Sequence, residues 1–162
     1  MTTPVPAIPV LAIPVLATGA DLPEMASIHA QAFDVRWDEK TLAGLLAGAG
    51  AYAFVTRAAD PTGMVLCRAI GGEAEVLTLA VPPWARRRGI AAALMAAAMD
   101  EARARDAAVM FLEVDVGNDA AVTLYERLGF ARAGLRKAYY NRGADGRADA
   151  LVMRLDLTSG AR

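Results

Sequence analysis

Cysteine and histidine are almost missing from this sequence. Its 162 residues include one cysteine, Cys67, and one histidine, His29. A lone cysteine cannot form an internal disulfide framework, and a lone histidine excludes the usual histidine-rich metal sites. We therefore expect a reduced, cytoplasmic setting and no bound metal. We also expect Cys67 to be a core residue rather than a nucleophile, and His29 to lie on a helix face or in a substrate groove.

An excess of charge of either sign is missing as well. Lysine and arginine together number 17, aspartate and glutamate 18, and the formal net charge is -1. Proteins that bind the phosphate backbone of nucleic acids usually carry a marked positive excess, so we expect no direct binding of nucleic acid. Hydrophobic residues make up 56% of the chain, which is enough for the packed core of one domain.

Long uninterrupted apolar runs are the third absence. The first 20 residues carry no charge, but prolines at positions 4, 6, 9 and 14 interrupt them. Because proline breaks helices, we expect no membrane-spanning segment there. The sequence Ala-Ile-Pro-Val-Leu at 7–11 is repeated at once at 12–16. We predict a loose tail over residues 1–10 and a single domain over 11–162 that begins with an edge strand, where proline is tolerated.

Helical and strand periodicities alternate along the rest of the chain. Helices are predicted over 21–33, from 39 to the glycines at 48–50, over 89–106 and from 119 to Gly129. Strands are predicted over 51–57, 64–70, 75–81, 109–114, 131–138 and 148–157. Turns are expected at 60–63, which contains proline and glycine, and at the pair Gly71 and Gly72. This order predicts a mixed α/β domain with no internal linker.

The strongest functional signal is the junction between the strand at 75–81 and the helix that follows. Three consecutive arginines and Gly89 precede a helix that opens with small residues. A helix N-terminus presents free backbone N–H groups and a positive dipole end, which together favour a bound phosphate. The P-loop and G-x-G-x-x-G patterns are missing, so ATP and NAD are disfavoured. The alternative is a solvated basic loop before an ordinary helix.

The pattern Arg86-x-x-Gly89-x-Ala91 resembles the acetyl-CoA-binding motif of the GCN5-related N-acetyltransferase (GNAT) superfamily. The segments Phe111–Val114, Asn118–Phe130, Arg136–Tyr140 and Asp149–Met153 extend the resemblance to its RimI-like branch, whose members acetylate the N-terminal alanine of a ribosomal protein. The resemblance implies a GNAT fold, in which about four helices flank one mixed, splayed sheet of about seven strands. It also implies acetyl-CoA as co-substrate and, as acceptor, a protein N-terminus, namely that of a ribosomal protein.

The same resemblance implies which residues bind the co-substrate. The strand end would pair with the pantetheine arm as an added strand does, and the helix start would hold the pyrophosphate. Asn118 would contact the pantetheine, although its type and position suit a helix N-cap equally well. The implied cofactor-binding residues are Leu79, Ala80, Val81, Arg86, Arg87, Arg88, Gly89, Ile90, Ala91, Ala92 and Asn118.

Catalytic and acceptor residues are implied in the same way. Glu113 is the one charged residue in the apolar run 109–114, and such a contradiction of the local pattern is typical of functional sites. The family match makes Glu113 the general base and Tyr125 the general acid. It places Phe33, Trp37 and Tyr139 in the acceptor groove, although core packing would explain the first two as well.

Two other functions remain open at this point. The first is acetylation of a small amine or an antibiotic by the same chemistry, which a peptide panel and a small-amine panel would separate. The second is a CoA-binding module without catalysis. The presence of both Glu113 and Tyr125 argues against that module, because a pure binder needs neither residue.

Overall fold

The computed structural model describes residues 13–58, 60–141 and 146–159. The predicted tail at 1–10 lies outside these residues, and so do residues 142–145, which lie between the last two predicted strands. The described elements are β1 (Ile13–Leu16), α1 (Leu22–Ala32), α2 (Glu39–Leu46), β2 (Ala51–Arg57), β3 (Pro61–Ile70), β4 (Glu73–Ala80), α3 (Ile90–Ala104), β5 (Val109–Asp115), α4 (Asp119–Arg127), β6 (Ala131–Asn141) and β7 (Arg147–Asp156). Short 3-10 turns precede α1 and α3, at Gly19–Asp21 and Pro83–Ala85.

The strands of the described residues form one mixed sheet in the order β1-β2-β3-β4-β5-β7-β6. Neighbouring strands are antiparallel except β4 and β5, which are parallel. The seven strands and four α-helices confirm the fold expected from the sequence. The second copy of the proline-containing repeat forms the edge strand β1, as predicted.

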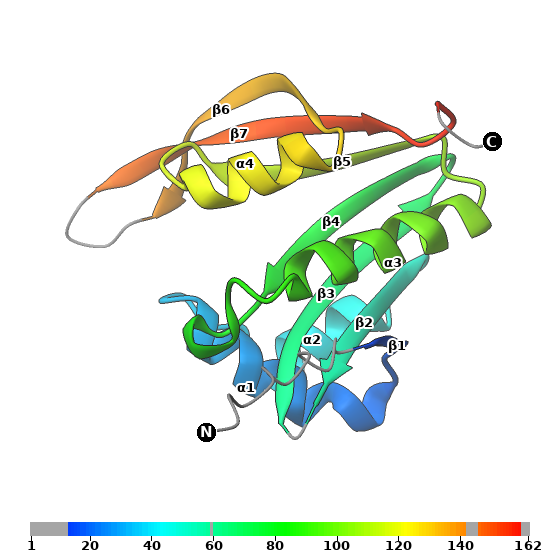
Figure 1. Ribbon diagram of the computed structural model, residues 1–162, viewed down its shortest axis with the longest axis vertical. Coiled ribbons are helices and arrows are strands. Elements are labelled where there is room, and N and C mark those ends of the chain that lie inside the picture. Colours follow the sequence, from blue (N-terminus) through cyan, green and yellow to red (C-terminus); the bar gives the residue numbers. More distant parts are fainter. Residues whose placement is uncertain (1–12, 59, 142–145, 160–162) are drawn as a thin grey trace, which may run out of the picture.

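Helices cover both faces of the sheet and create two apolar cores (Figure 1). One core lies under α1 and α2 and includes Met25, Ile28 and Leu42 together with alternate residues of β2 and β3. The larger core lies under α3 and α4 and takes the other face of those strands and one face of β5 and β7. The alternation of the side chains therefore directs successive residues of β2 and of β3 to one core and then to the other.

Strands β4 and β5 diverge along their length, and this divergence is the feature that creates the site. They pair over only three residues, from Glu73 to Glu75 on β4, and then separate (Figure 1). A β-bulge follows directly: on β3, Leu66 pairs with Thr78 while Cys67 pairs with Val76, so that β4 carries one extra residue. A bulge bends its strand and increases its twist, which turns the second half of β4 away from β5.

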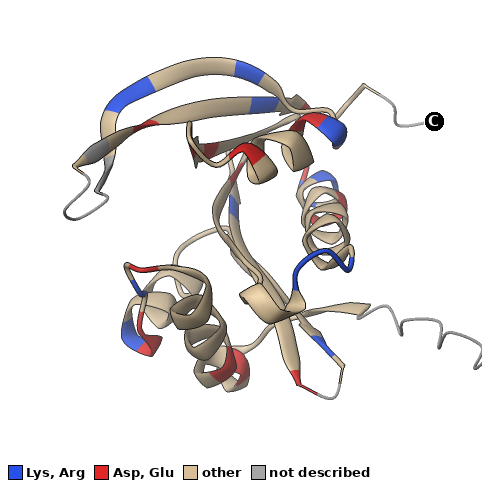
Figure 2. Cartoon of the chain, turned by 60° about the vertical axis from the view of Figure 1, so that its left-hand side comes forward, with Lys and Arg blue, Asp and Glu red and all other residues tan. Residues whose placement is uncertain are grey.

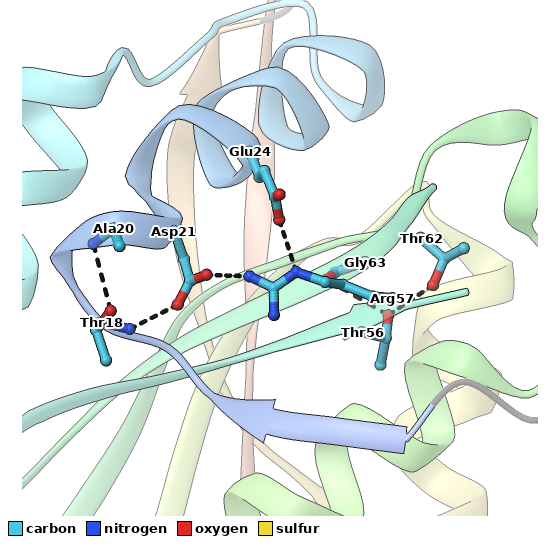
Figure 3. Close-up of polar contacts among 8 residues, drawn as sticks. All are labelled: Thr18, Ala20, Asp21, Glu24, Thr56, Arg57, Thr62 and Gly63. Carbon is cyan, nitrogen blue, oxygen red and sulfur yellow. Dashed lines mark hydrogen bonds and ion pairs between the residues drawn. The ribbon is translucent and has the colours of Figure 1, made fainter. Parts of the chain in front are cut away.

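The start of α1 is fixed to the sheet by charged contacts rather than by a simple cap. Arg57, at the end of β2, forms ion pairs with Asp21 and with Glu24, the latter at 3.0 Å (Figure 3). Asp21 is the N-cap residue of α1, but its side chain makes no capping hydrogen bond to that helix. Its carboxylate instead accepts from the Thr18 N–H at 2.7 Å, within a capping box that belongs to the preceding 3-10 turn.

The prediction of a turn at 60–63 is wrong, because β3 already begins at Pro61. The hydroxyls of Thr56 and Thr62 are buried and hydrogen-bond to each other across the two strands at 2.8 Å (Figure 3). Gly63 is required by close packing rather than by a turn. A Cβ atom at this position would come within 2.9 Å of side-chain atoms of Ile90 and Leu94, so glycine lets α3 approach the sheet.

His29 connects the end of α1 to the segment that leads into α2. Its side chain is buried, and its Nδ1 accepts a hydrogen bond from the backbone N–H of Trp37 at 3.1 Å. The imidazole also stacks on the indole of Trp37 and contacts the ring of Phe33, with centroids 5.0 and 4.6 Å away. Burial lowers the pKa of His29, which keeps Nδ1 unprotonated and able to accept.

A dependence of stability on pH follows from this contact. The unfolded chain binds a proton at His29 more readily than the folded chain does, so the contribution of His29 is complete above pH 6.5 and is lost as the pH falls towards the lowered native pKa. His29→Asn keeps an acceptor for the Trp37 N–H but cannot titrate. We expect wild type to lose more unfolding free energy than His29→Asn between pH 7.5 and pH 5, by about 1.4 kcal/mol for each unit of pKa shift. Urea unfolding at both pH values measures this, and equal losses would contradict it.

Candidate active site

The opening between β4 and β5 exposes the backbone of two strand edges. Beyond Glu75, β4 keeps its partner β3 on one side, through pairs that include Leu79 with Val65 and Ala80 with Met64. Within the described residues it has no strand partner on the β5 side over this stretch. Strand edges of this kind can pair with another extended chain. The predicted residues Leu79 and Ala80 lie on that edge, and Val81 follows directly after the strand.

The N-terminus of α3 lies beside this opening and is not capped by a side chain. Gly89 is its N-cap residue, with a left-handed φ of 76°. The first intrahelical bond runs from the Ala93 N–H to the Gly89 carbonyl at 3.0 Å. The N–H groups of Ile90, Ala91 and Ala92 therefore lie in the first turn, where an α-helix offers no internal acceptor. A Cβ atom added to Gly89 would meet no atom of the protein within 4 Å, so the space in front of this helix end is open.

The three arginines before α3 are exposed and form a basic loop (Figure 2). Arg87 adopts a left-handed φ of 62°, which is unusual for a residue with a side chain. Arg86 bends back, and its Nε donates to the carbonyl of Val81 at 3.0 Å. Arg86 thus shapes the loop, while all three guanidinium groups add positive charge at the helix end. Open N–H groups, a helix dipole and these arginines together can hold a diphosphate.

Glu113 lies on β5 with its side chain on the face opposite to α3 and α4. Burial alternates along β5: Leu112 and Val114 enter the core under those helices, and Glu113 is only partly buried. The carboxylate accepts a hydrogen bond from Arg136 on β6, with Nη1 and Oε1 2.8 Å apart. Glu113 also lines a surface pocket over the paired end of β4 and β5, which is lined further by Arg68, Ile70, Glu73, Ala74, Glu75, Phe111, Leu112 and Val152.

Tyr139 belongs to the same group of side chains. The guanidinium carbon of Arg136 lies 3.9 Å from the centre of the Tyr139 ring, in a cation–π contact. Tyr139 is 46% exposed, and its role at the acceptor stays a prediction. Arg136 therefore contacts both Glu113, the predicted base, and Tyr139, a predicted acceptor residue.

Tyr125 approaches β5 from the other face of the sheet. It lies on the buried face of α4, in the core that includes Leu112 and Val114. Its ring meets Phe130 edge-on, with centroids 5.9 Å apart. Glu113 and Tyr125 thus lie on opposite faces of β5, and Glu113 belongs to the half of β5 that β4 leaves unpaired. Such a pair can exchange protons with the two ends of a reacting group inserted between the strands.

Asn118 acts as a helix cap in this structure. Its Oδ1 accepts from the Ala121 N–H at 3.2 Å, at the N-terminus of α4. Of the two roles that the sequence allowed, the structural one is therefore observed. A second contact of the same side chain with a cofactor stays a prediction.

The predicted acceptor residues Phe33 and Trp37 lie in the α1–α2 connection and are joined by His29, as described above. Phe33 is 40% exposed, whereas Trp37 is partly buried. The end of α1 is also joined to the loop before α3, because the indole N–H of Trp84 donates to Gln31 Oε1 at 2.9 Å. Sequence reasoning assigned no role to Trp84 or Arg136, because long-range side-chain contacts leave no periodic signal in a single sequence.

Other candidates can be placed as well. Cys67 lies fully buried in β3, and burial raises the pKa of its thiol to about 12, so the thiol stays protonated at neutral pH. Among the described residues, no three side chains of the types that bind metals are grouped so that they could hold an ion. In the same part of the chain, no helix has the length and apolar character needed to cross a membrane.

Comparisons with known proteins agree with this geometry. Residues 22–130 match the model of the acetyltransferase (GNAT) family. The chain is 34% identical over 138 residues to the [ribosomal protein bS18]-alanine N-acetyltransferase of Escherichia coli K12, which covers 85% of this chain and 93% of that relative.

Solved structures lead to the same family. The crystal structure of the ribosomal-protein-S18-alanine N-acetyltransferase from Escherichia coli superposes with a TM-score of 0.81 and 32% identity, over 90% of this chain and 94% of that one. NAA60 of Arabidopsis thaliana, solved in complex with acetyl-CoA, shares the fold at a TM-score of 0.76 and 18% identity, over 89% of this chain and 98% of that one. The resemblance inferred from the sequence is thereby confirmed, and the chain belongs to the acetyltransferase (GNAT) family.

Proposed function

We propose that this protein transfers an acetyl group from acetyl-CoA to the N-terminal amine of a protein, with an N-terminal alanine of a ribosomal protein as the expected acceptor. The observation that carries the proposal is the divergence of β4 from β5 directly beside an open helix N-terminus and a loop of three arginines. The relative that is 34% identical acts, by its name, on the alanine of a ribosomal protein. Such an acceptor places the reaction in the cytoplasm.

The donor site follows from the two halves of this arrangement. The pyrophosphate binds at the N-H groups of Ile90, Ala91 and Ala92, with charge from Arg87 and Arg88. The pantetheine arm lies along the unpaired edge formed by Leu79, Ala80 and Val81, as an added strand would. When bound, acetyl-CoA supplies a thioester whose carbonyl carbon is open to attack by an amine.

The acceptor amine reaches the thioester from the face of the sheet that carries Glu113. An amine attacks only in its neutral form, so Glu113, directly or through a water molecule, removes the proton from the ammonium. The bond from nitrogen to the acetyl carbon forms and the carbon–sulfur bond breaks. Tyr125, on the other face of β5, donates its hydroxyl proton to the departing sulfur. The second proton of the nitrogen returns to Tyr125 through solvent, and Glu113 releases its proton to solvent, so the products are an amide, the CoA thiol and one proton.

The acceptor groove is framed by Phe33 and Trp37 on one side and by Tyr139 on the other. Phe33 and Trp37 come from the α1–α2 connection, and Tyr139 comes from β6. A groove of this kind admits a narrow, extended N-terminus with a small first side chain, such as alanine or serine.

The donor site can be tested at Gly89. Gly89→Val places a branched side chain in the open space before α3, where it blocks the pyrophosphate, whereas Arg88→Ala removes one charge at a cost of about 1–2 kcal/mol. We expect Gly89→Val to weaken acetyl-CoA binding more than Arg88→Ala does, as measured by calorimetric titration.

A control is needed because valine is strained at a left-handed φ, by about 1–2 kcal/mol. Gly72 has a similar φ of 84° and is equally open, but it lies in the β3–β4 turn at the far end of β4. Gly72→Val should lower the stability of the fold to a similar extent and leave the affinity for acetyl-CoA unchanged. If Gly89→Val binds acetyl-CoA as tightly as wild type does, the N-terminus of α3 is not part of the donor site.

The two proton-transfer roles differ in their response to pH. Glu113→Gln should lower kcat by roughly 10²–10⁴ with the affinity for acetyl-CoA nearly intact. Higher pH should partly restore its activity, because an α-amine with a pKa near 7.7–8.0 then loses its proton to solvent. Tyr125→Phe should also be impaired, but without alkaline recovery. Thiol-release assays between pH 7 and 9.5 measure both effects, and full activity of Glu113→Gln at pH 7 would place the base elsewhere.

The choice of amine follows from proton energetics. A peptide α-amine titrates near 7.7–8.0 and a lysine side chain near 10.4, a difference of about 3.4 kcal/mol for deprotonation. We therefore expect a peptide that carries both an N-terminal alanine and an internal lysine to be acetylated mainly at its N-terminus. Mass spectrometry of the product locates the acetyl group. Predominant acetylation of the lysine would contradict the proposed acceptor and leave the family assignment untouched.

A further inference from the structure

Arg136 reaches Glu113 across an intervening strand. It lies on β6, whereas Glu113 lies on β5, and β7 runs between them. Ala150 of β7 pairs in register with Arg136 on one side and with Asp115 on the other, so these three residues share one face of the sheet. Ala150 is fully buried and has only a methyl group, which leaves room for the long side chain of Arg136 above β7.

The contact between Arg136 and Tyr139 depends on an irregularity in β6. In a regular strand, residues three apart point to opposite faces of the sheet. The register of β6 against β7 shifts between Arg136 and Tyr140, and Ala138 has a left-handed φ of 54°. The Ala138 N–H donates to Asp149 Oδ1 at 2.8 Å, which holds this bulge in place. The bulge turns the Tyr139 ring to the face that carries the Arg136 guanidinium.

Stability gives little reason for this arrangement. The Arg136 side chain is 54% exposed and that of Glu113 is 23% exposed, and ion pairs with this much solvent contribute little to folding. Strand bulges are, in contrast, common next to active sites, where they orient side chains. Here the bulge orients Tyr139 towards Arg136, and the Arg136 side chain extends across β7 to Glu113. Arg136 fixes one carboxylate oxygen of Glu113, and the Tyr139 ring covers the guanidinium from the other side.

We propose that Arg136 is a positioning residue for the acetyl transfer: it holds the Glu113 carboxylate in the orientation in which it receives the amine proton and holds Tyr139 at the edge of the acceptor groove. This inference rests on the proposed function, since it requires Glu113 to be the base. Arg136 itself takes no part in proton transfer. Its effect on turnover passes through Glu113, and its effect on acceptor binding passes through Tyr139.

A double-mutant cycle tests the first of these effects. Arg136→Gln should lower kcat for a short peptide with an N-terminal alanine on the order of 10-fold to 100-fold, because a misplaced catalytic group loses rate steeply. In the Glu113→Gln background the same change should lower kcat less than about 3-fold, because the group that Arg136 orients is already gone. Arg136→Lys keeps the charge but not the planar fork, so we expect only partial recovery. Calorimetric affinity for acetyl-CoA should stay at the wild-type value in all of these variants.

Arg132 provides the matched control. It lies on the same strand and also forms an exposed ion pair, with Glu126 at 3.2 Å, away from Glu113. Arg132→Gln should leave kcat and KM unchanged. Tyr139→Ala removes the ring that contacts the Arg136 guanidinium, and we expect it to raise the acceptor KM.

The outcomes separate this proposal from the function on which it rests. Non-additive losses in Arg136→Gln and Glu113→Gln support the positioning role. If Glu113→Gln is impaired but Arg136→Gln lowers kcat by the same factor in both backgrounds, Arg136 acts independently of Glu113 and the positioning role is wrong, while the proposed function stands. If Glu113→Gln is fully active, both the base assignment and the role of Arg136 are wrong. If Arg132→Gln lowers kcat as much as Arg136→Gln does, the loss comes from a general disturbance of strand β6, and the proposal is overturned.

Discussion

Most of the site depends on the three residues over which β4 and β5 pair. Backbone hydrogen bonds hold these central strands together only from Glu73 to Glu75 on β4, and the bulge around Val76–Thr78 prevents the ladder from continuing. The divergence creates two free strand edges beside the open N-terminus of α3, and it leaves Glu113 on the half of β5 that β4 does not pair with. A regular, fully paired sheet from the same residues would contain all of the side chains and no site.

The order of elements could be predicted from the sequence because it depends on local periodicity. The apolar run of β5 and the helical spacing that follows Asn118 and ends before Gly129 are local signals, and each predicted its element correctly. The error at 60–63 has a physical reason as well. Gly63 was taken as a turn residue, whereas its small size allows α3 to pack closely on β3.

The geometry of the site was less accessible from the sequence. Glu113 stood out as a charge in an apolar strand, and Gly89 as a glycine at a helix start, because each breaks a local pattern. Arg136 and His29 break no pattern, since an arginine on an exposed strand and a histidine on a helix are both ordinary. Their importance comes from partners 23 and 8 residues away in the sequence, which only the folded chain brings together.

The free edges of β4 and β5 also bear on aggregation. Unpaired strand edges usually invite pairing with a second copy of the chain, and many proteins protect them with charged residues, proline or a covering element. Here the two edges face each other inside the molecule and diverge at an angle. A strand that pairs with one edge must keep a spacing of about 4.7–4.9 Å along it, and it therefore moves away from the other edge. A foreign strand therefore cannot pair with both edges at once, and α3 and α4 flank one face of the opening. The wedge shape that admits a single slender chain thus protects these two inner edges against edge-to-edge association.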